Sequence, residues 1–478
     1  MRAWLLLDGI TVRNYRSGKA FVLNGNDIRL VAPVVANAAV PDIGGIHYTG
    51  GTGFRCSDAT VTTTGDAVRL APVAAGGTIT DAALTGMRLS AGTGMALVIE
   101  TLFGPLNAVR VSGLVAEAKA TYNVLRIRNA NAGTITGITV RDAVLTSRAV
   151  VSEAVAVDAL NIQNNGTAAG VSIADILLDN VTVAIAAGTG TEKVAPAAVR
   201  MTTAGDAVIE GVSWSGGGVR PTDAAGPMFP TRYMTLRKAN RVWMGPLRLD
   251  GSTHPQPVLV GEVGPCRDVV FEDVVMTRVA NGATGAVTFD KATHCGWVRG
   301  AITGSAGAIF QSVSFNVSSV GCYLEGVDLG GNAQAPDAKA TVTTAAAYRL
   351  VDNFESTQRS AVGLGTPVTV GLTATGAIRA PSSFVALNPN GGTTLNTITF
   401  GPTGTTAERQ SQPGDLLVLT TVPGQTATVN DATSTVGNIR LASAAGATGI
   451  VLGPGGRDTL TLMCRADDWI ELAASRND

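Results

Sequence analysis

The sequence predicts an all-β protein in which residues 1–331 form a parallel β-helix of about twelve coils. Three observations predict this fold. A short pattern of alternating apolar residues followed by Asp, Asn or Gly recurs along this region. Most copies are 26 to 34 residues apart, the period expected of stacked strand repeats. The apolar runs are short and rich in β-branched residues, glycine interrupts them, and no long run of helix formers occurs.

The first apolar residue of each copy gives a register mark, which we call the anchor. The twelve predicted anchors are Ile10, Ile28, Phe54, Ala82, Val109, Ile138, Ile176, Val208, Val242, Val269, Val298 and Leu324. The copies at Val208, Val298 and Leu324 are a residue or two short. Stacked strands lie about 4.8 Å apart, so twelve coils would form a rod roughly 55 Å long.

Three cysteines support this register. Cys266, Cys295 and Cys322 each precede an anchor by two or three residues. We therefore expect their thiols to stack inside the core. The five cysteines include no CxxC pair, so we expect no disulfide framework and no zinc site. Buried reduced thiols are typical of a protein that folds in the cytoplasm.

The pattern changes after the repeats. We predict a connector over 332–360, which opens with small and polar residues, and a C-terminal antiparallel β domain over 361–478. In this last region alternating stretches at 366–372 and 393–400 are separated by Pro-Asn-Gly-Gly and Gly-Pro-Thr-Gly turns. Its size, roughly 100 residues, is common for a domain.

Charge and motifs lower the expectation of several functions. The net charge is −1, so no nucleic-acid partner is expected. The apolar opening ends at Asp8, which is too short for a signal peptide or a membrane span, and we expect no membrane insertion. The three histidines, His47, His254 and His294, are far apart. With no phosphate loop either, we expect neither a metal site nor a cofactor.

The coil pattern resembles the pectin-lyase-like right-handed β-helices. The end of the chain, with G-Q-T-A-T-V, G-N-I-R-L-A and D-D-W-I-E-L, resembles the C-terminal β domains of phage fibres and spikes. Together they are similar to trimeric phage tailspikes and to the head-spike fibres of phage-like gene transfer agents. This resemblance implies a homotrimer that is assembled in bacterial cytoplasm. On the surface of a virion or phage-like particle it would contact other virion proteins at one end and bind host cell-surface polysaccharide. A slim rod also gains stability when three copies pack together.

Long spacings between Ile138 and Val242 predict loops at about 146–170, 184–204 and 215–240. The third loop and its flanks combine rings with cations. Rings stack on sugars and guanidinium groups bind carboxylates, so we predict that it binds an acidic glycan. The alternative is that the rings pack the loop onto the rod or a neighbouring subunit while the cations stay solvated. The candidates are Trp214, Arg220, Phe229, Arg232, Tyr233, Arg237, Lys238 and Trp243.

Glycan cleavage would need two carboxyl groups roughly 5–5.5 Å or 6.5–9.5 Å apart. The candidates are Asp175 and Asp179 on one coil with Asp206 and Glu210 on the next. Recurrence offers a structural explanation, because Asp and Asn stabilise tight turns. Four residues after an anchor the chain has Asn14, Asp58, Asp142, Asn180 and Asp273, and Asp175 and Asp268 each directly precede one.

Three functions remain open from the sequence. The leading prediction is a structural receptor-binding spike that attaches a phage-like particle to host glycan. The second is a polysaccharide depolymerase, a hydrolase or lyase, on the same scaffold; the polygalacturonase motifs Asn-Thr-Asp, Asp-Asp, Gly-His-Gly and Arg-Ile-Lys are absent as a set. The third is a virion fibre with no sugar site.

Overall fold

The computed structural model describes most of the 478-residue chain and all of the elements discussed below. Outside the described residues lie 1–3, 38–39, 41–42, 73–76, 120–122, 149–157, 167–171, 187–196, 206, 224–227, 230, 262–263, 280–284, 305–312, 317, 330–339, 343–347, 352–366, 381–382, 401–415, 433–436, 443–448, 466–467 and 476–478. The described residues form strands and turns, without helices.

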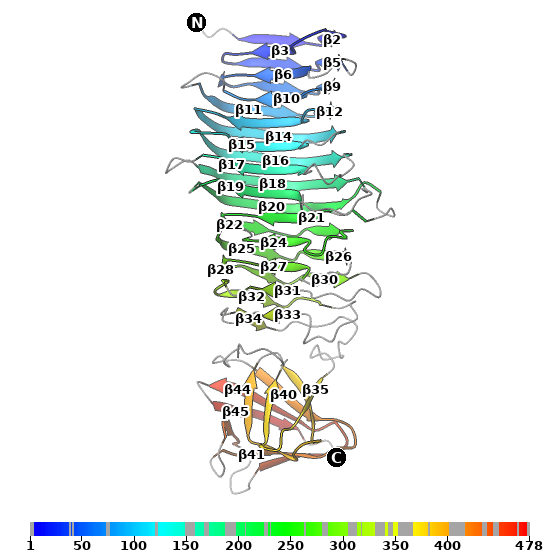
Figure 1. Cartoon of the computed structure of the whole chain (residues 1–478), viewed down its shortest axis with the longest axis vertical. Helices are drawn as coiled ribbons and strands as arrows, with labels where there is room; N and C mark the ends of the chain where they lie inside the picture. Colours follow the sequence, from blue (N-terminus) through cyan, green and yellow to red (C-terminus); the bar gives the residue numbers. More distant parts are fainter. Residues whose placement is uncertain are drawn as a thin grey trace.

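The predicted parallel β-helix is confirmed, and Figure 1 shows its coils stacked in chain order along the long axis of the molecule. Two long sheets run the length of the rod, one of 22 and one of 12 strands, and every pairing within them is parallel. The larger sheet bends and so supplies two of the three faces of each coil, which we call faces one and two. The smaller sheet is face three.

The bounds of the strands follow the three faces. Face one contains β1 (Leu5–Asp8), β4 (Ile28–Val31), β7 (Gly51–Thr52), β8 (Arg55–Ser57), β11 (Ile79–Thr85), β22 (Ala239–Met244), β25 (Cys266–Glu272), β28 (Ala292–Thr293), β29 (Gly296–Val298), β32 (Cys322–Glu325) and β34 (Tyr348–Val351). Face two contains β2 (Thr11–Arg13), β5 (Val34–Asn37), β9 (Thr60–Thr63), β12 (Arg88–Ala91), β23 (Arg248–Asp250), β26 (Val275–Val279) and β30 (Ala301–Gly304). Face three contains β3 (Lys19–Leu23), β6 (Gly44–Tyr48), β10 (Val68–Leu70), β13 (Leu97–Thr101), β15 (Leu125–Asn129), β17 (Leu160–Asn164), β19 (Ala197–Thr203), β21 (Arg232–Leu236), β24 (Val258–Val260), β27 (Val287–Phe289), β31 (Val313–Phe315) and β33 (Ala340–Val342).

In the middle coils single strands cross both faces of the larger sheet. These are β14 (Pro105–Ala118), β16 (Thr134–Ser147), β18 (Ser172–Ile185) and β20 (Val208–Pro221). They turn from face one to face two at one residue with positive φ, which we call the corner residue. Only Gly, Asn and Asp adopt this conformation readily. The corner residues, with φ from 47° to 70°, are Gly9, Ala32, Asp58, Gly86, Gly113, Asp142, Asn180, Gly216, Asp273, Arg299 and Gly326.

This geometry explains the recurrent Asp and Asn residues. Asp58, Asp142, Asn180 and Asp273 are corner residues, as the structural interpretation of the sequence proposed. Asn14 also has positive φ, but it pairs one face later, and Gly9 is the corner of its coil. A second series of positive-φ residues, which we call kink residues, directly precedes the anchors. It consists of Asp27, Gly53, Asp81, Ala108, Gly137, Asp175, Gly211, Arg241, Asp268, His294 and Gly321.

The strand register corrects four predicted anchors. Leu5, Val212, Cys295 and Cys322 occupy the positions predicted for Ile10, Val208, Val298 and Leu324. The errors fall mainly where the copies deviate from the pattern. Inward-facing residues recur at every second position, so the slips of four residues at Val208 and two at Leu324 leave the apolar pattern of a short copy intact. The slips of five residues at Ile10 and three at Val298 are odd and do not follow from this periodicity.

The cysteine prediction is correct for burial and partly wrong for stacking. All five cysteines are buried. Cys295 and Cys322 occupy equivalent positions on successive coils, whereas Cys266 pairs with Ala292 and lies three residues earlier in its own coil. The core around them contains large rings as well, and Phe271 stacks on Trp297 with 4.8 Å between ring centroids.

The helix continues past the boundary predicted at residue 331. Strand β33 pairs with β31, and β34 pairs with β32, so the two sheets reach Val351. Strand β33 lies in a run of small and polar residues, and β34 has only four residues, so the apolar repeat used to find the coils did not reveal either strand. The rest of the predicted connector, 332–339, 343–347 and 352–360, lies outside the described residues.

The C-terminal region folds as a small β domain, drawn beyond the last coils in Figure 1. It has its own core, which includes Leu419, Leu460 and Trp469. Its main sheet has the order β35 (Val368–Gly371), β37 (Phe384–Asn388), β40 (Leu416–Thr421), β44 (Thr459–Arg465), β45 (Asp468–Ser475) and β42 (Ile439–Arg440). Two smaller sheets pair β36 (Ala377–Ala380) with β39 (Thr397–Phe400), and β38 (Thr394–Leu395) with β41 (Ala427–Asn430) and β43 (Gly449–Leu452).

The predicted antiparallel arrangement holds for only part of this domain, which is mixed. Strands β40, β44 and β45 are antiparallel neighbours, but β35, β37 and β40 are parallel. The Pro-Asn-Gly-Gly turn at 389–392 leads from β37 into β38 of another sheet, instead of closing a hairpin. Turn composition indicates that a strand ends, and it does not specify which strand will be its neighbour.

Candidate functional site

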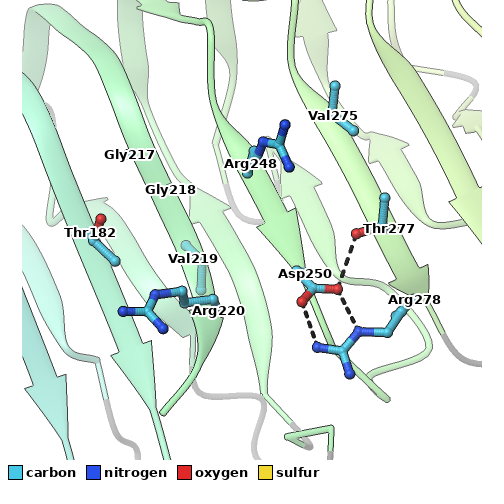
Figure 2. Close-up of a pocket in the computed structure, with 10 residues that line it drawn as sticks. All are labelled: Thr182, Gly217, Gly218, Val219, Arg220, Arg248, Asp250, Val275, Thr277 and Arg278. Carbon is cyan, nitrogen blue, oxygen red and sulfur yellow. Dashed lines mark hydrogen bonds and ion pairs between the residues drawn. The ribbon is translucent and has the colours of Figure 1, made fainter. Parts of the chain in front are cut away.

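A hollow of about 430 Å³ opens on the outer side of face two. Strands β18, β20, β23 and β26 of successive coils supply its walls (Figure 2). Its lining residues are Thr182, Gly217, Gly218, Val219, Arg220, Arg248, Asp250, Val275, Thr277 and Arg278.

Two glycines create the depression. Thr182, Gly218, Arg248 and Val275 are successive partners in one outward-facing row, so the row has no side chain at Gly218. A Cβ atom there would lie 1.8 Å from the carbonyl oxygen of Arg248, and φ is +138°. At Gly217 a Cβ atom would lie 2.1 Å from the carbonyl oxygen of Val181. The floor of the hollow is therefore bare backbone, which only glycine permits at this close approach.

The walls of the hollow carry an excess of positive charge. Three guanidinium groups, those of Arg220, Arg248 and Arg278, accompany one carboxylate, that of Asp250. Arg278 donates from Nε to Oδ1 of Asp250 at 2.7 Å and from Nη2 to Oδ2. These bonds hold the pKa of Asp250 below its usual value and raise the pKa of Arg278.

Arg220 and Arg248 are both exposed, and neither has an ion-pair partner among the described residues. In Figure 2 the interactions drawn between the lining residues all converge on Asp250, and none reaches Arg220 or Arg248. Two uncompensated guanidinium groups at a concave surface attract an anion, and each can bind a carboxylate through two parallel hydrogen bonds. The hollow is therefore a candidate anion-binding site.

A buried tyrosine supports the wall from inside. The hydroxyl of Tyr233, on face three, donates to the carbonyl of Thr277 at 3.2 Å and accepts from the amide of Ser252 at 3.0 Å. Burial raises the pKa of Tyr233, so the hydroxyl keeps its proton and remains a donor. Thr277 also donates from Oγ1 to Oδ1 of Asp250 at 3.0 Å. This chain of bonds links the core to the wall of the hollow.

Three of the four candidate rings near the third loop pack inside the rod, as the alternative interpretation of the sequence proposed. Trp214, Phe229 and Tyr233 are fully buried in the helix core. Trp214 pairs with Leu178 and Met244 in an inward-facing row, so it packs between coils. Only Trp243 keeps an exposed ring, with 36% of its surface accessible.

The predicted cations lie in different environments. Arg220 lines the hollow. Arg232 is buried and donates to Oε1 of Gln256 at 3.1 Å. Lys238 donates from Nζ to the carbonyl of Gly205, and Arg237 is half-buried. Burial and these bonds make Arg232 and Lys238 poor ligands for a glycan. Arg220 is exposed and has no ion-pair partner among the described residues, so its guanidinium group can bind one.

Sequence reasoning missed Arg248, Asp250 and Arg278, because they follow the predicted loop at 215–240. The usable signal was the strand register. Arg248 lies opposite Gly218 on the next coil, and Asp250 lies two residues further along the same face. Parts of the three predicted loops, including 149–157, 187–196 and 224–227, lie outside the described residues.

The structure does not bring the four candidate acids together as one set of facing carboxyl groups. Asp206 lies outside the described residues. Asp179 pairs with Ser215, while Glu210 pairs with Ala174, five positions earlier, so these two acids are about 16 Å apart along the strands. The carboxylate of Glu210 binds Arg241 at 2.8 Å, and that of Asp179 lies 3.5 Å from Arg141. Asp175 is a kink residue, which explains its position without catalysis.

The described part of the chain lacks two kinds of feature. It contains no group of three or more His, Cys, Asp or Glu side chains placed to hold a metal ion. It also contains no helix long and apolar enough to cross a membrane.

Compared with family models, with curated proteins and with solved structures, the chain gives no match.

Proposed function

We propose that this protein is a receptor-binding spike of a phage or phage-like particle, and that its hollow binds a carboxylate-bearing polysaccharide on the host surface. The observation that supports the proposal most directly is the pair of uncompensated guanidinium groups, Arg220 and Arg248, beside the glycine floor. The parallel β-helix supports it further, because a stiff rod presents its lateral faces to a long polymer.

The chemistry of the hollow favours an acidic sugar over a neutral one. A uronic acid carboxylate would accept hydrogen bonds from Arg248 or Arg220 in the two-bond geometry that guanidinium prefers. Arg278 is already bound to Asp250 and would stay in place as part of the wall. In this proposal the spike is a homotrimer that contacts other virion proteins at one end, as the resemblance to tailspikes implies.

The proposal is tested with purified capsular polysaccharides that contain uronic acid, each paired with its carboxyl-reduced form. Binding and polymer length are measured in the same samples. We expect the native polymers to bind, the reduced forms to bind at least about tenfold more weakly, and binding to weaken as salt is raised. Polymer length should not change. A shortened polymer would instead identify a depolymerase, and equal binding of native and reduced polymers would contradict the proposed site.

A matched set of variants locates the site. Arg220→Ala and Arg248→Ala should each weaken binding of the native polymer about tenfold, which corresponds to one charge-assisted contact. Arg88→Ala is the control, because Arg88 is exposed in the same outward-facing row of face two, several coils away. An equal loss in all three variants would indicate non-specific attraction and would overturn the assignment to the hollow.

A further inference from the structure

Face one carries two aromatic rings in a single outward-facing row. Trp243 pairs with Val270, Val270 with Gly296, and Gly296 with Tyr323, so these residues follow one another on four successive coils. Trp243 is exposed and Tyr323 is half-buried. Among the described Trp and Phe residues, only Trp4, Phe103 and Trp243 are exposed.

The tyrosine ring is laid along the row. A Cβ atom on Gly296 would lie 2.4 Å from Cδ2 and Cε2 of Tyr323, so the ring covers the glycine of the preceding coil. Burial against this surface raises the pKa of Tyr323. The ring is therefore directed back towards Val270 and Trp243, and the row between the two aromatic residues is low and apolar.

The indole of Trp243 is fixed by a polar network. Its Nε1 donates to Oε2 of Glu272 at 2.8 Å. Glu272 accepts from Nη2 of Arg299, and Arg299 also donates from Nε to Oδ1 of Asp273 at 2.9 Å. The bonds from Trp243 and Arg299 hold the pKa of Glu272 below its usual value, so the carboxylate stays ionised as an acceptor. A ring held in this way loses little freedom when a ligand stacks on it.

This row is adjacent to the hollow. Asp273 and Arg299 are corner residues, so they lie on the edge where face one meets face two. Trp243 is on the coil that supplies Arg248, before the edge, and Val275 of the hollow follows Asp273 by two residues. The hollow and the aromatic row therefore lie on either side of one edge of the rod, and they share the coils that contain Trp243 and Arg248 and, next, Val270 and Val275.

From this arrangement we infer that Trp243 and Tyr323 form a second subsite, in which the rings stack on neutral pyranose units of the same polysaccharide. The identity of the polymer rests on the proposed function, but the subsite does not need a carboxylate. Sugar faces that carry C–H groups pack on aromatic rings, while Glu272, Asp273 and Arg299 are positioned to exchange hydrogen bonds with hydroxyl groups. The hollow then recognises the charge of a carboxylate, and the two rings recognise the shape of a neutral sugar.

Tryptophan fluorescence tests the subsite without altering it. Trp214, Trp297 and Trp469 are fully buried, and Trp4 is the other exposed indole. In a Trp4→Phe background, acrylamide quenching therefore reports on Trp243. We expect both the native and the carboxyl-reduced polymer to decrease the quenching constant at saturation. Quenching that stays unchanged with every polysaccharide of the panel would overturn the inference.

Variants provide the second readout. Trp243→Ala should weaken binding of the carboxyl-reduced polymer about two- to tenfold, whereas Trp243→Phe should retain most of it. Tyr323→Phe keeps the ring over Gly296 and should bind the carboxyl-reduced polymer as tightly as the unaltered chain does. Tyr323→Ala removes the ring and should bind this polymer more weakly. If Arg248→Ala weakens binding but Trp243→Ala leaves it unchanged, the proposed function stands and the second subsite is wrong. If Trp243 is protected while Arg248→Ala has no effect, the anionic part of the proposed function fails and the subsite stands.

Discussion

Arg278 and Asp250, on adjacent coils, are joined by two hydrogen bonds, of which the one from Nε to Oδ1 measures 2.7 Å. The pair crosses between strands β23 and β26 and forms one wall of the hollow (Figure 2). It also separates the three guanidinium groups of the hollow into two classes. Arg278 is neutralised by its partner, whereas Arg220 and Arg248 are available to an external anion.

Replacing Asp250 by Asn should lower the free energy of unfolding by about 1 kcal/mol at neutral pH, since the ion pair is partly buried and has two bonds. The pKa of Asp250 is lowered in the folded protein. Its contribution is therefore fully present above the unfolded pKa of about 3.9 and is lost as the pH falls through the folded value. Urea denaturation at a series of pH values checks this. A difference between the two proteins that persists unchanged at the lowest pH would contradict it.

Glu100 is the most strongly buried carboxylate with several cationic partners. It binds Arg69 at 3.1 Å, Arg126 at 2.8 Å and Arg128 at 3.1 Å on the outer side of face three, and its side chain is 2% exposed. Glu100→Gln should destabilise the fold by about 3–5 kcal/mol, because it removes the carboxylate that Arg126 and Arg128 bind. Arg69 keeps its second ion pair, with Asp66 at 3.1 Å.

The matched control for that variant is Glu117→Gln. Glu117 binds Arg148 at 2.8 Å, but Arg148 is more than half exposed, so its loss should cost about 1 kcal/mol or less. Thermal unfolding of the two variants in parallel is the measurement. Equal shifts in Tm would mean that the Glu100 cluster is solvated and does not depend on its carboxylate.

The corner geometry at Asn180 predicts that a glycine variant is more stable than a valine variant. Its φ is +53°, and its Nδ2 donates to Oδ1 of Asp142 on the preceding coil at 2.8 Å. Asn180→Val should lower stability by about 1–3 kcal/mol, because a β-branched residue is strained at positive φ. Asn180→Gly should cost less, since glycine accepts this conformation and only the hydrogen bond is lost. Denaturant midpoints give the order, and a valine variant as stable as the glycine variant would contradict the corner geometry.

The cysteines should be protected from thiol reagents while the protein is folded. All five are buried, and burial raises the pKa of Cys56 to about 12 and that of Cys266 to about 11. Thiol reagents attack the thiolate, so at pH 8 low access protects all five thiols and low ionisation adds to the protection of Cys56 and Cys266. We expect no rapid labelling in native buffer and five labelled thiols after unfolding, counted by mass spectrometry. Fast labelling of Cys295 or Cys322 in the folded protein would contradict the register of the last coils.

The sequence predicted the register correctly where the coils are regular and less well where they are not. The copies from Phe54 to Ile176 are regular, and their anchors are correct. Val208 was four residues from the true position, because the coil between Ile176 and Val212 is long and two positions within it fit the apolar pattern. In the C-terminal domain the strands were visible, but their neighbours were not, since pairing there depends on contacts between distant segments.

The candidate site was predicted only in part, for a reason that Trp214 and Trp243 make clear. Both lie near the predicted loop, yet Trp214 faces inward and is fully buried, while Trp243 faces outward. The direction of each ring depends on its place in the inward–outward alternation of its own strand, and closeness in sequence to the predicted loop does not decide it. Arg248 and Tyr323 were missed because each is distant in sequence from its neighbour on the adjacent coil, Gly218 for Arg248 and Gly296 for Tyr323.

The sequence by itself determined that this chain is a stack of parallel coils, that Asp and Asn recur at tight turns, and that its cysteines are internal. These properties follow from local patterns, because a repeated period and the conformational preferences of single residues act within one coil. Only the tertiary structure decided which charges are neutralised, where the outward row drops to bare backbone at Gly218, and which rings reach the surface. Those properties depend on how each coil is aligned with the next, and insertions between coils set that alignment.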